Sequence, residues 1–253
     1  MAREDSRGML ERGLDILGAL GDHPEGVSLT DIVKATGLPV STTHRLLSIV
    51  VSSKFASFDE QTKRYTLGMR IFELANRVRS VQTISQAARP RMRELAEHTG
   101  ETIQLAVLAD DSAMFLEKVG ADRSITIRGS VGQREPLWAT STGKVLLASL
   151  DEPERAETVA QLAIRAYTDH TMTSRAELLE HLKQVALQGW AFTDEEYDRD
   201  VRAIAVPVNN TEDRVVAALC IAGPKYRLDL DTLQAWLPEL QATANYIGVQ
   251  LAP

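Results

Sequence analysis

Apolar residues recur at helical spacing in three short stretches at the start of the chain, which predicts three helices. The first covers residues 9–20 and is followed by the turn sequence Gly-Asp-His-Pro. The second begins at Ser28, which stands three residues before Asp31 as in a helix-capping box. Gly37 provides a corner, and a third helix is expected at about residues 39–51.

The third predicted helix has one apolar face and one face of hydrogen-bonding groups. Ser41, His44, Arg45 and Ser48 cluster on the polar side, Thr42 flanks them, and no acidic residue occurs in this helix. Short polar side chains and an arginine, with no carboxylate to repel phosphate, suit a recognition helix in a DNA major groove. An ordinary amphipathic helix pair with a solvated polar face explains the same pattern.

A hairpin follows, with strands near residues 52–58 and 65–67 around a polar turn. Three helices and a hairpin describe a winged helix-turn-helix. Lys63 and Arg64 close to the tip are then candidates for contacts to phosphates or to a minor groove, although a solvated turn has the same composition. The predicted DNA-binding residues are Ser28, Ser41, Thr42, Thr43, His44, Arg45, Ser48, Lys63 and Arg64.

The rest of the chain mixes helices and strands. A linker helix is predicted over residues 69–82, and another helix over 83–99. Turns at Asp110-Asp111 and Asn209-Asn210 indicate antiparallel pairing and an α+β domain. The expected strands are 102–108, 113–119, 125–128, 190–193, 201–208 and 215–222, and the expected helices are 141–149, 153–161, 175–188 and 231–251. The predicted domain limits are 1–68 for the winged unit, 69–82 for the linker helix and 83–253 for the C-terminal domain.

Composition narrows the class of protein. The 253 residues suffice for two domains, and a single cysteine, Cys220, allows no internal disulfide. No apolar run is long enough to cross a bilayer and the N-terminus lacks a signal-peptide pattern, so a cytoplasmic protein without a membrane partner is expected. The net charge of −7 argues against non-specific nucleic-acid binding, but residues 34–79 carry a local net charge of +5.

Residues 136–144 in the C-terminal domain carry groups that could bind a carboxylate. Thr140, Ser141 and Thr142 supply hydroxyl groups, and the backbone N–H groups at the start of the next helix can bind an anion. A plain helix N-cap explains the same residues. Asp194 and its two acidic neighbours could accept hydrogen bonds from a ligand, do acid–base work, bind a metal or form a surface ion-pair cluster with nearby arginines. Lys144 is expected on the helix surface.

Seven segments in a fixed order carry a family resemblance. In the N-terminal part they are LERGLDIL (10–17), GLPVSTTHRLL (37–47) and RYTLG (64–68). In the C-terminal part they are PLWATSTGKVLLA (136–148), DEEY (194–197), IAVPV (204–208) and VVAALCIAGP (215–224). The chain resembles the IclR-type bacterial transcriptional regulators along nearly its whole length.

The resemblance implies a winged helix-turn-helix joined by a helix to a GAF-like effector domain with an antiparallel sheet. It also implies a homodimer or homotetramer on palindromic or pseudo-palindromic double-stranded DNA, and a small organic acid or aromatic metabolite as effector. Repression of a catabolic operon is expected, because repression is the commoner behaviour of the family. The effector-binding residues expected with its help are Gly132, Leu137, Thr140, Ser141, Thr142, Asp194, Ala203, Cys220 and Ala222.

Departures from the family pattern bear on the ligand. Relatives commonly carry Cys where Ala203 stands and Ser at one or both positions of Cys220 and Ala222, which suggests a pocket for a ligand larger or less polar than a two- or three-carbon oxoacid. An enzyme on the C-terminal domain is the alternative function. No nucleophile–base, metal-binding or phosphate-loop motif supports it, and neither a cofactor nor a metal is expected.

Overall fold

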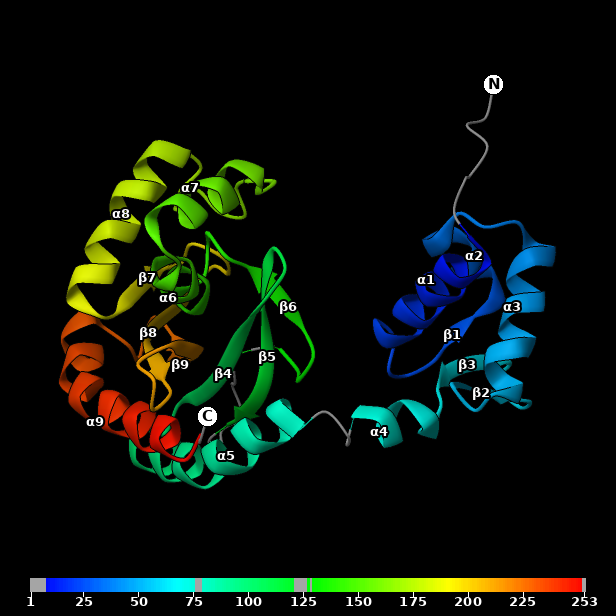
Figure 1. Cartoon of the computed structure of the whole chain (residues 1–253), viewed down its shortest axis with the longest axis horizontal. Coiled ribbons are helices and arrows are strands. Elements are labelled where there is room, and N and C mark those ends of the chain that lie inside the picture. Colours follow the sequence, from blue (N-terminus) through cyan, green and yellow to red (C-terminus); the bar gives the residue numbers. More distant parts are fainter. Residues whose placement is uncertain (1–7, 76–78, 121–126, 128, 252–253) are drawn as a thin grey trace. The chain divides into compact units, whose positions relative to one another are not determined.

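The computed structural model describes residues 8–75, 79–120, 127 and 129–251. The chain divides into two compact units, Met1–Arg79 and Ser80–Pro253, and each is described by itself (Figure 1). The boundary falls inside the segment for which a linker helix is predicted.

The first unit is built from three helices and a small sheet. Helices α1 (Met9–Gly21), α2 (Leu29–Thr36) and α3 (Val40–Ser52) pack on one another. Strands β2 (Ala56–Asp59) and β3 (Arg64–Leu67) form the predicted hairpin, and a two-residue strand, β1 (Val27–Ser28), adds to β3. The core is formed by the buried side chains of Ile16, Leu20, Val27, Ile32, Leu38, Leu46, Leu47 and Ala56.

Local sequence signals set the helix-turn-helix corner as predicted. The Ser28 hydroxyl accepts from the Asp31 N–H at 3.3 Å and donates to the Asp31 carboxylate at 2.7 Å, so Ser28 caps α2. Gly37 ends α2 in the left-handed region with a φ of 69°, and its N–H donates to the Val33 carbonyl.

The segment after the wing differs from the prediction. Helix α4 covers Met69–Ala75, and residues 76–78 lie outside the described part of the chain. Helix α5 covers Arg79–Thr99, so it begins four residues before the predicted start at residue 83. Pro90 lies inside α5, where the sequence pattern alone left open whether it stood inside the helix or at its start.

The second unit contains a six-stranded antiparallel sheet with the order β6-β5-β4-β9-β8-β7. The strands are β4 (Thr102–Ala109), β5 (Ser112–Val119), β6 (Arg134–Pro136), β7 (Ala191–Asp194), β8 (Val201–Asn209) and β9 (Val215–Pro224). The helices are α6 (Ser141–Ser149), α7 (Glu152–Gln161), α8 (Arg175–Gln188) and α9 (Leu230–Val249). The predicted strand 125–128 lies outside the described residues except for Ile127, which is not in a strand. The short strand β6 was not predicted.

The two faces of this sheet carry side chains of different size. Large aliphatic residues such as Ile204, Leu219 and Ile221 face α5 and α9. The opposite face lies under α6, α7 and α8 (Figure 1). On that face, β8 and β9 carry Ala203, Ala205, Ala218, Cys220 and Ala222. Because the side chains of a strand alternate between the two faces, the same strand places large side chains against α5 and α9 and small ones on the side of α6.

Candidate functional site

Helix α3 presents the predicted DNA-binding face to solvent. Ser41, His44, Arg45 and Ser48 are exposed and Thr42 is half-buried. The Ser48 hydroxyl donates to the His44 carbonyl at 2.9 Å. The helix therefore offers a guanidinium, an imidazole and hydroxyl groups on one exposed surface.

Thr43 has to be removed from the predicted DNA-binding set. Its side chain is fully buried in the core of the unit, and its hydroxyl donates to the Pro39 carbonyl at 3.1 Å. The spacing of 3.6 residues per turn places Thr43 with Leu46 and Leu47, not with Arg45.

The remaining predicted contacts lie at the wing and at the helix corner. Lys63 is exposed in the hairpin turn with a φ of 54°, and its Nζ lies 5.8 Å from the centroid of the Phe58 ring. Arg64 is exposed in β3, and its Nη1 donates to the Gly26 carbonyl at 2.6 Å, which ties β3 to the segment before β1. Both hydrogen-bonding functions of the Ser28 hydroxyl are engaged by Asp31. DNA contacts by these side chains stay a prediction.

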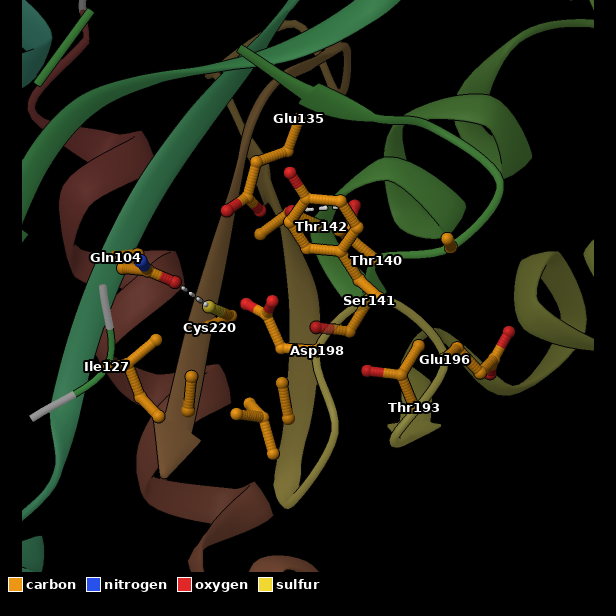
Figure 2. Close-up of a pocket in the computed structure, with 15 residues that line it drawn as sticks. Gln104, Ile127, Glu135, Thr140, Ser141, Thr142, Thr193, Glu196, Asp198 and Cys220 are labelled. Atoms are coloured by element: carbon orange, nitrogen blue, oxygen red, sulfur yellow. Dashed lines mark hydrogen bonds between the residues drawn. The ribbon is translucent and has the colours of Figure 1, made fainter. Parts of the chain in front are cut away.

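The second unit holds a small pocket on the face of the sheet that carries the small side chains (Figure 2). Its cavity volume is about 40 Å³, enough for roughly three water molecules. The lining residues are Gln104, Ile127, Glu135, Ala139, Thr140, Ser141, Thr142, Thr193, Glu196, Tyr197, Asp198, Val201, Ala203, Cys220 and Ala222. Six of the nine predicted effector-binding residues are among them.

The first turn of α6 forms one side of the pocket. The Thr140 hydroxyl accepts from the Gly143 N–H at 3.2 Å and donates to the Pro136 carbonyl at 2.8 Å. The cap leaves the N–H groups of Ser141 and Thr142 as the open donors of the turn among the described residues. Thr140 therefore caps the helix and also lines the pocket, and its contact with an effector stays a prediction.

Gly143 lets this turn sit close to the preceding segment. A Cβ on Gly143 would lie 2.4 Å from the Leu137 Cα, well inside contact distance. Every residue of α6 from Ser141 to Ala148 is buried, so the helix is enclosed between the sheet and α8. The partial positive charge of its N-terminus is therefore poorly screened by water.

The sheet forms the floor of the pocket. Cys220 donates weakly to the Gln104 Oε1 with a sulfur–oxygen distance of 3.4 Å, shown as the dashed line in Figure 2. Burial raises the pKa of the Cys220 thiol and the nearby Glu135 raises it further, so the thiol stays protonated and unreactive. Gln104 is 4% exposed, yet its Nε2 has no hydrogen-bond partner in the described structure. A buried amide with an unused donor suits a ligand acceptor.

The charged residues that line the pocket are the carboxylates Glu135, Glu196 and Asp198. Burial, together with the negative charge of Asp198, raises the pKa of Glu135 to about 7, and Lys118 opposes that rise. The Lys118 ammonium donates to the carbonyls of Ile127 and Gly129 at 2.5 and 2.8 Å. Burial also raises the pKa of the Tyr197 phenol, which remains a hydrogen-bond donor. No Lys, Arg or His occurs among the lining residues.

Lys144 is buried, contrary to its predicted place on the helix surface. Its side chain is fully enclosed, and the distance from its Nζ to the Glu196 Oε1 is 2.5 Å. Burial lowers the pKa of Lys144, and the Glu196 carboxylate opposes that change. The second oxygen, Glu196 Oε2, has no partner within the described residues, and Glu196 also lines the pocket. The Glu196 carboxylate therefore contacts the buried Lys144 ammonium and also lines the pocket.

Three predicted effector-binding residues do not line the cavity. Leu137 is fully buried in the core beneath α6. Gly132 lies in the exposed turn before β6, and its N–H donates to the Phe115 carbonyl. Both Asp194 oxygens accept from Arg202, at 2.8 and 2.9 Å, so the ion-pair interpretation of Asp194 is the one that the structure supports. The described cavity therefore does not support these three assignments, which stay predictions.

Sequence reasoning missed the polar residues opposite α6. Gln104 carried a usable signal, because a polar residue stood in the apolar stretch Thr102–Leu108. Glu135 directly precedes the PLWATS segment, and Asp198 directly follows DEEY. No sequence spacing brought these residues together, because they come from three separate parts of the sheet and its loops.

Metal binding and membrane insertion find no support in the described part of the chain. No group of three or more His, Cys, Asp or Glu side chains there could hold a metal ion. None of its helices combines the length and the apolar composition that a membrane span requires.

Comparisons with known proteins agree over both units. The sequence matches the IclR helix-turn-helix domain over residues 9–59 and the bacterial transcriptional regulator IclR C-terminal domain over residues 76–249. It is 31% identical to the HTH-type transcriptional regulator KdgR of Escherichia coli over 247 residues, which is 98% of this chain and 94% of that protein. It is 30% identical to the transcriptional repressor IclR of Escherichia coli, over 88% of this chain and 82% of that protein.

A solved structure has the same architecture. The crystal structure of an IclR homologue in complex with 4-hydroxybenzoate, from Microbacterium hydrocarbonoxydans, superposes with a TM-score of 0.83. It is 27% identical, over 96% of this chain and 99% of that chain. The relatives are named as transcriptional regulators, and the chain is not an enzyme. It belongs to the IclR family of bacterial DNA-binding transcriptional regulators.

Proposed function

We propose that this regulator represses a catabolic operon in the cytoplasm. When a small organic acid or aromatic metabolite binds the pocket of the second unit, the protein dissociates from its DNA or binds it in a different way. The observation that carries the proposal is the pocket itself, which is lined by the first turn of α6 with its open N–H groups and by Gln104 with its unused buried amide donor. Unpaired buried donors cost free energy, and an acceptor on a ligand would remove that cost.

Two of the similar proteins support the finer points. The IclR protein of Escherichia coli is named a transcriptional repressor, which favours repression here. The Microbacterium homologue was crystallised with 4-hydroxybenzoate, which favours an acid as effector. The relevant coupling between ligand and DNA is expected to be about 1–3 kcal/mol, as in other allosteric proteins.

A homodimer or homotetramer on a palindromic or pseudo-palindromic operator completes the proposal. One α3 reads one half-site, and two half-sites a helical turn or a multiple apart need two copies of the winged unit. Arg45 is the residue expected to distinguish bases, since its guanidinium can bridge two acceptors of a guanine.

The test is fluorescence anisotropy with labelled DNA from upstream of the gene's own coding region, at a fixed and stated salt concentration. A shuffled fragment of the same composition is the control. Preferential binding, together with reduced transcription from that fragment in vitro, is the expected result. Equal affinity for both fragments, with and without candidate acids, would contradict the proposal.

A further inference from the structure

A second cavity lies in the same unit, between the C-terminal halves of α6 and α8 and the sheet that they cover (Figure 1). Its volume is about 290 Å³, several times that of the pocket at the first turn of α6. Val145 and Ala148 of α6 and Val185 and Ala186 of α8 form its helical side. An apolar cavity of about 150 Å³ holds a benzene ring, so this cavity has room for a molecule of one or two rings.

The sheet side of the cavity continues a row of side chains that begins in the first pocket. On β8, Ala203 lines the first pocket, and Pro207 and Asn209 line the second cavity further along the strand. Asn209 pairs with Val215 of β9, which also lines the cavity, so both side chains lie on the α6 side of the sheet. The two cavities are therefore at opposite ends of α6, and among the described residues they share no lining residue.

The polar side chains of the second cavity use their donors within the protein. The Ser149 hydroxyl donates to the Leu146 carbonyl at 2.6 Å. The Asn209 Nδ2 donates to the Asp213 carboxylate at 3.4 Å, and this contact fixes the orientation of the amide, because an amide oxygen would be repelled there. The Asn209 Oδ1 is buried and has no hydrogen-bond partner within the described residues. A bound molecule that donates to this oxygen would remove the cost of leaving it unpaired.

The charges around the cavity favour an uncharged ligand. None of its lining residues in the described part of the chain is charged. Helix α8 ends here at Gly189, and its last turn has no basic residue to offset the negative end of the helix dipole. A carboxylate would therefore be repelled, and an ammonium group would lose its hydration without gaining a carboxylate partner in the cavity wall.

We propose that this cavity is a second small-molecule site for an uncharged, mainly apolar molecule of one or two rings, whose N–H or O–H group donates to the Asn209 Oδ1. The site is independent of the effector-binding role proposed above, because it has its own lining residues and takes a ligand of different charge. A molecule bound here contacts Val145 and Ala148 on the helix whose first turn lines the first pocket.

The experiment is calorimetric titration of the full-length protein with indole and with 1-methylindole. Both probes are uncharged and have the same two rings, but only indole carries an N–H donor. We expect indole to bind once per chain and about twofold to tenfold more tightly than 1-methylindole, as one net hydrogen bond predicts. Equal affinities for the two probes, or no binding of indole up to its solubility limit, would overturn the proposal.

Three variants locate the binding. Ala186→Leu fills the cavity from the exposed side of α8 and should lower the affinity for indole at least about fivefold. Gln184→Leu adds an apolar side chain at an exposed position of the same helix that does not line the cavity, and this control should bind indole as the wild type does. Asn209→Leu removes the acceptor, so indole should lose its advantage while 1-methylindole binds no more weakly. Unchanged indole affinity in Ala186→Leu would place the binding elsewhere and refute the assignment.

A second copy of the chain is the other occupant that this surface could have. Sedimentation of the wild type, Ala186→Leu and Gln184→Leu at one protein concentration distinguishes the two. We expect the same mass for all three proteins, because Ala186 then faces a small-molecule site. A lower mass for Ala186→Leu alone would show that the cavity belongs to a protein interface and would overturn the proposal.

Discussion

Glu135→Gln should make the second unit more stable at neutral and alkaline pH. In the folded protein the pKa of Glu135 is raised to about 7, chiefly by burial and then by Asp198, from an ordinary value of 4.5. Below pH 4.5 the carboxyl group is protonated in both the folded and the unfolded state, so it contributes no pH dependence. Between 4.5 and about 7 the unfolded chain releases the proton and the folded chain keeps it, so the free energy of unfolding falls as pH rises.

The size of this loss follows from the same values. About 1.4 kcal/mol per pKa unit gives an upper bound of roughly 3 kcal/mol for the carboxylate above pH 7. Because Glu135 is half-buried, screening by solvent leaves about 1–2 kcal/mol. Glu135→Gln should therefore gain about 1–2 kcal/mol over the wild type at about pH 8, and most of this gain should be absent at about pH 5.

Urea denaturation followed by tryptophan fluorescence measures this gain in the relevant unit. All three tryptophans, Trp138, Trp190 and Trp236, lie in the second unit, so the signal excludes the winged unit. Glu97→Gln, at an exposed position of α5, is the matched control and should not change the pH dependence. A Glu135→Gln variant that is less stable than the wild type at pH 8, or that keeps the same pH dependence, would refute the electrostatic account.

Three further predictions concern other residues. In an anisotropy assay, Arg45→Ala should weaken binding to a specific operator by about 1–3 kcal/mol and reduce the preference between bases. The control Lys183→Ala on α8 should change neither, and equal losses of affinity in both variants would count against recognition by α3. Lys144→Met leaves the Glu196 carboxylate unpaired and should lower the free energy of unfolding by about 3–5 kcal/mol, with partial recovery on adding Glu196→Gln. Cys220, with a buried thiol whose pKa is raised, should react with iodoacetamide only as the unit unfolds, and rapid labelling of native protein would show that the thiol is accessible.

Helices whose ends are marked by capping residues close in the sequence were predicted most accurately. The helix expected at residues 141–149 is observed with the same limits because Thr140 caps it. The helix expected at 175–188 is also exact at both ends, where Ser174 supplies the N-cap and Gly189 adopts the left-handed conformation. These features depend on residues within a few positions of one another.

Features that depend on distant partners were not predictable in this way. Nothing local distinguishes Lys144 from a surface lysine, because the carboxylate that pairs with it is 52 positions away in Glu196. The two-residue strand β1 is stabilised by pairing with β3, and its sequence carries no period. Glu135 and Asp198 likewise come to line the pocket only in the folded sheet, and the apolar residues Ala203, Cys220 and Ala222 gave no sign of these carboxylates.

Large and small side chains alternate across the central sheet, so substitutions that change the pocket are separated from substitutions that change the packing against α5 and α9. On β8, Ile204 and Val206 face the layer of α5 and α9, while Ala203 and Ala205 face the α6 side. Exchanging an alanine for a serine or a cysteine on the α6 side alters what a metabolite meets and leaves the opposite layer untouched. Sensors for chemically different nutrients can thus diverge from one scaffold through single substitutions at every second position of a strand.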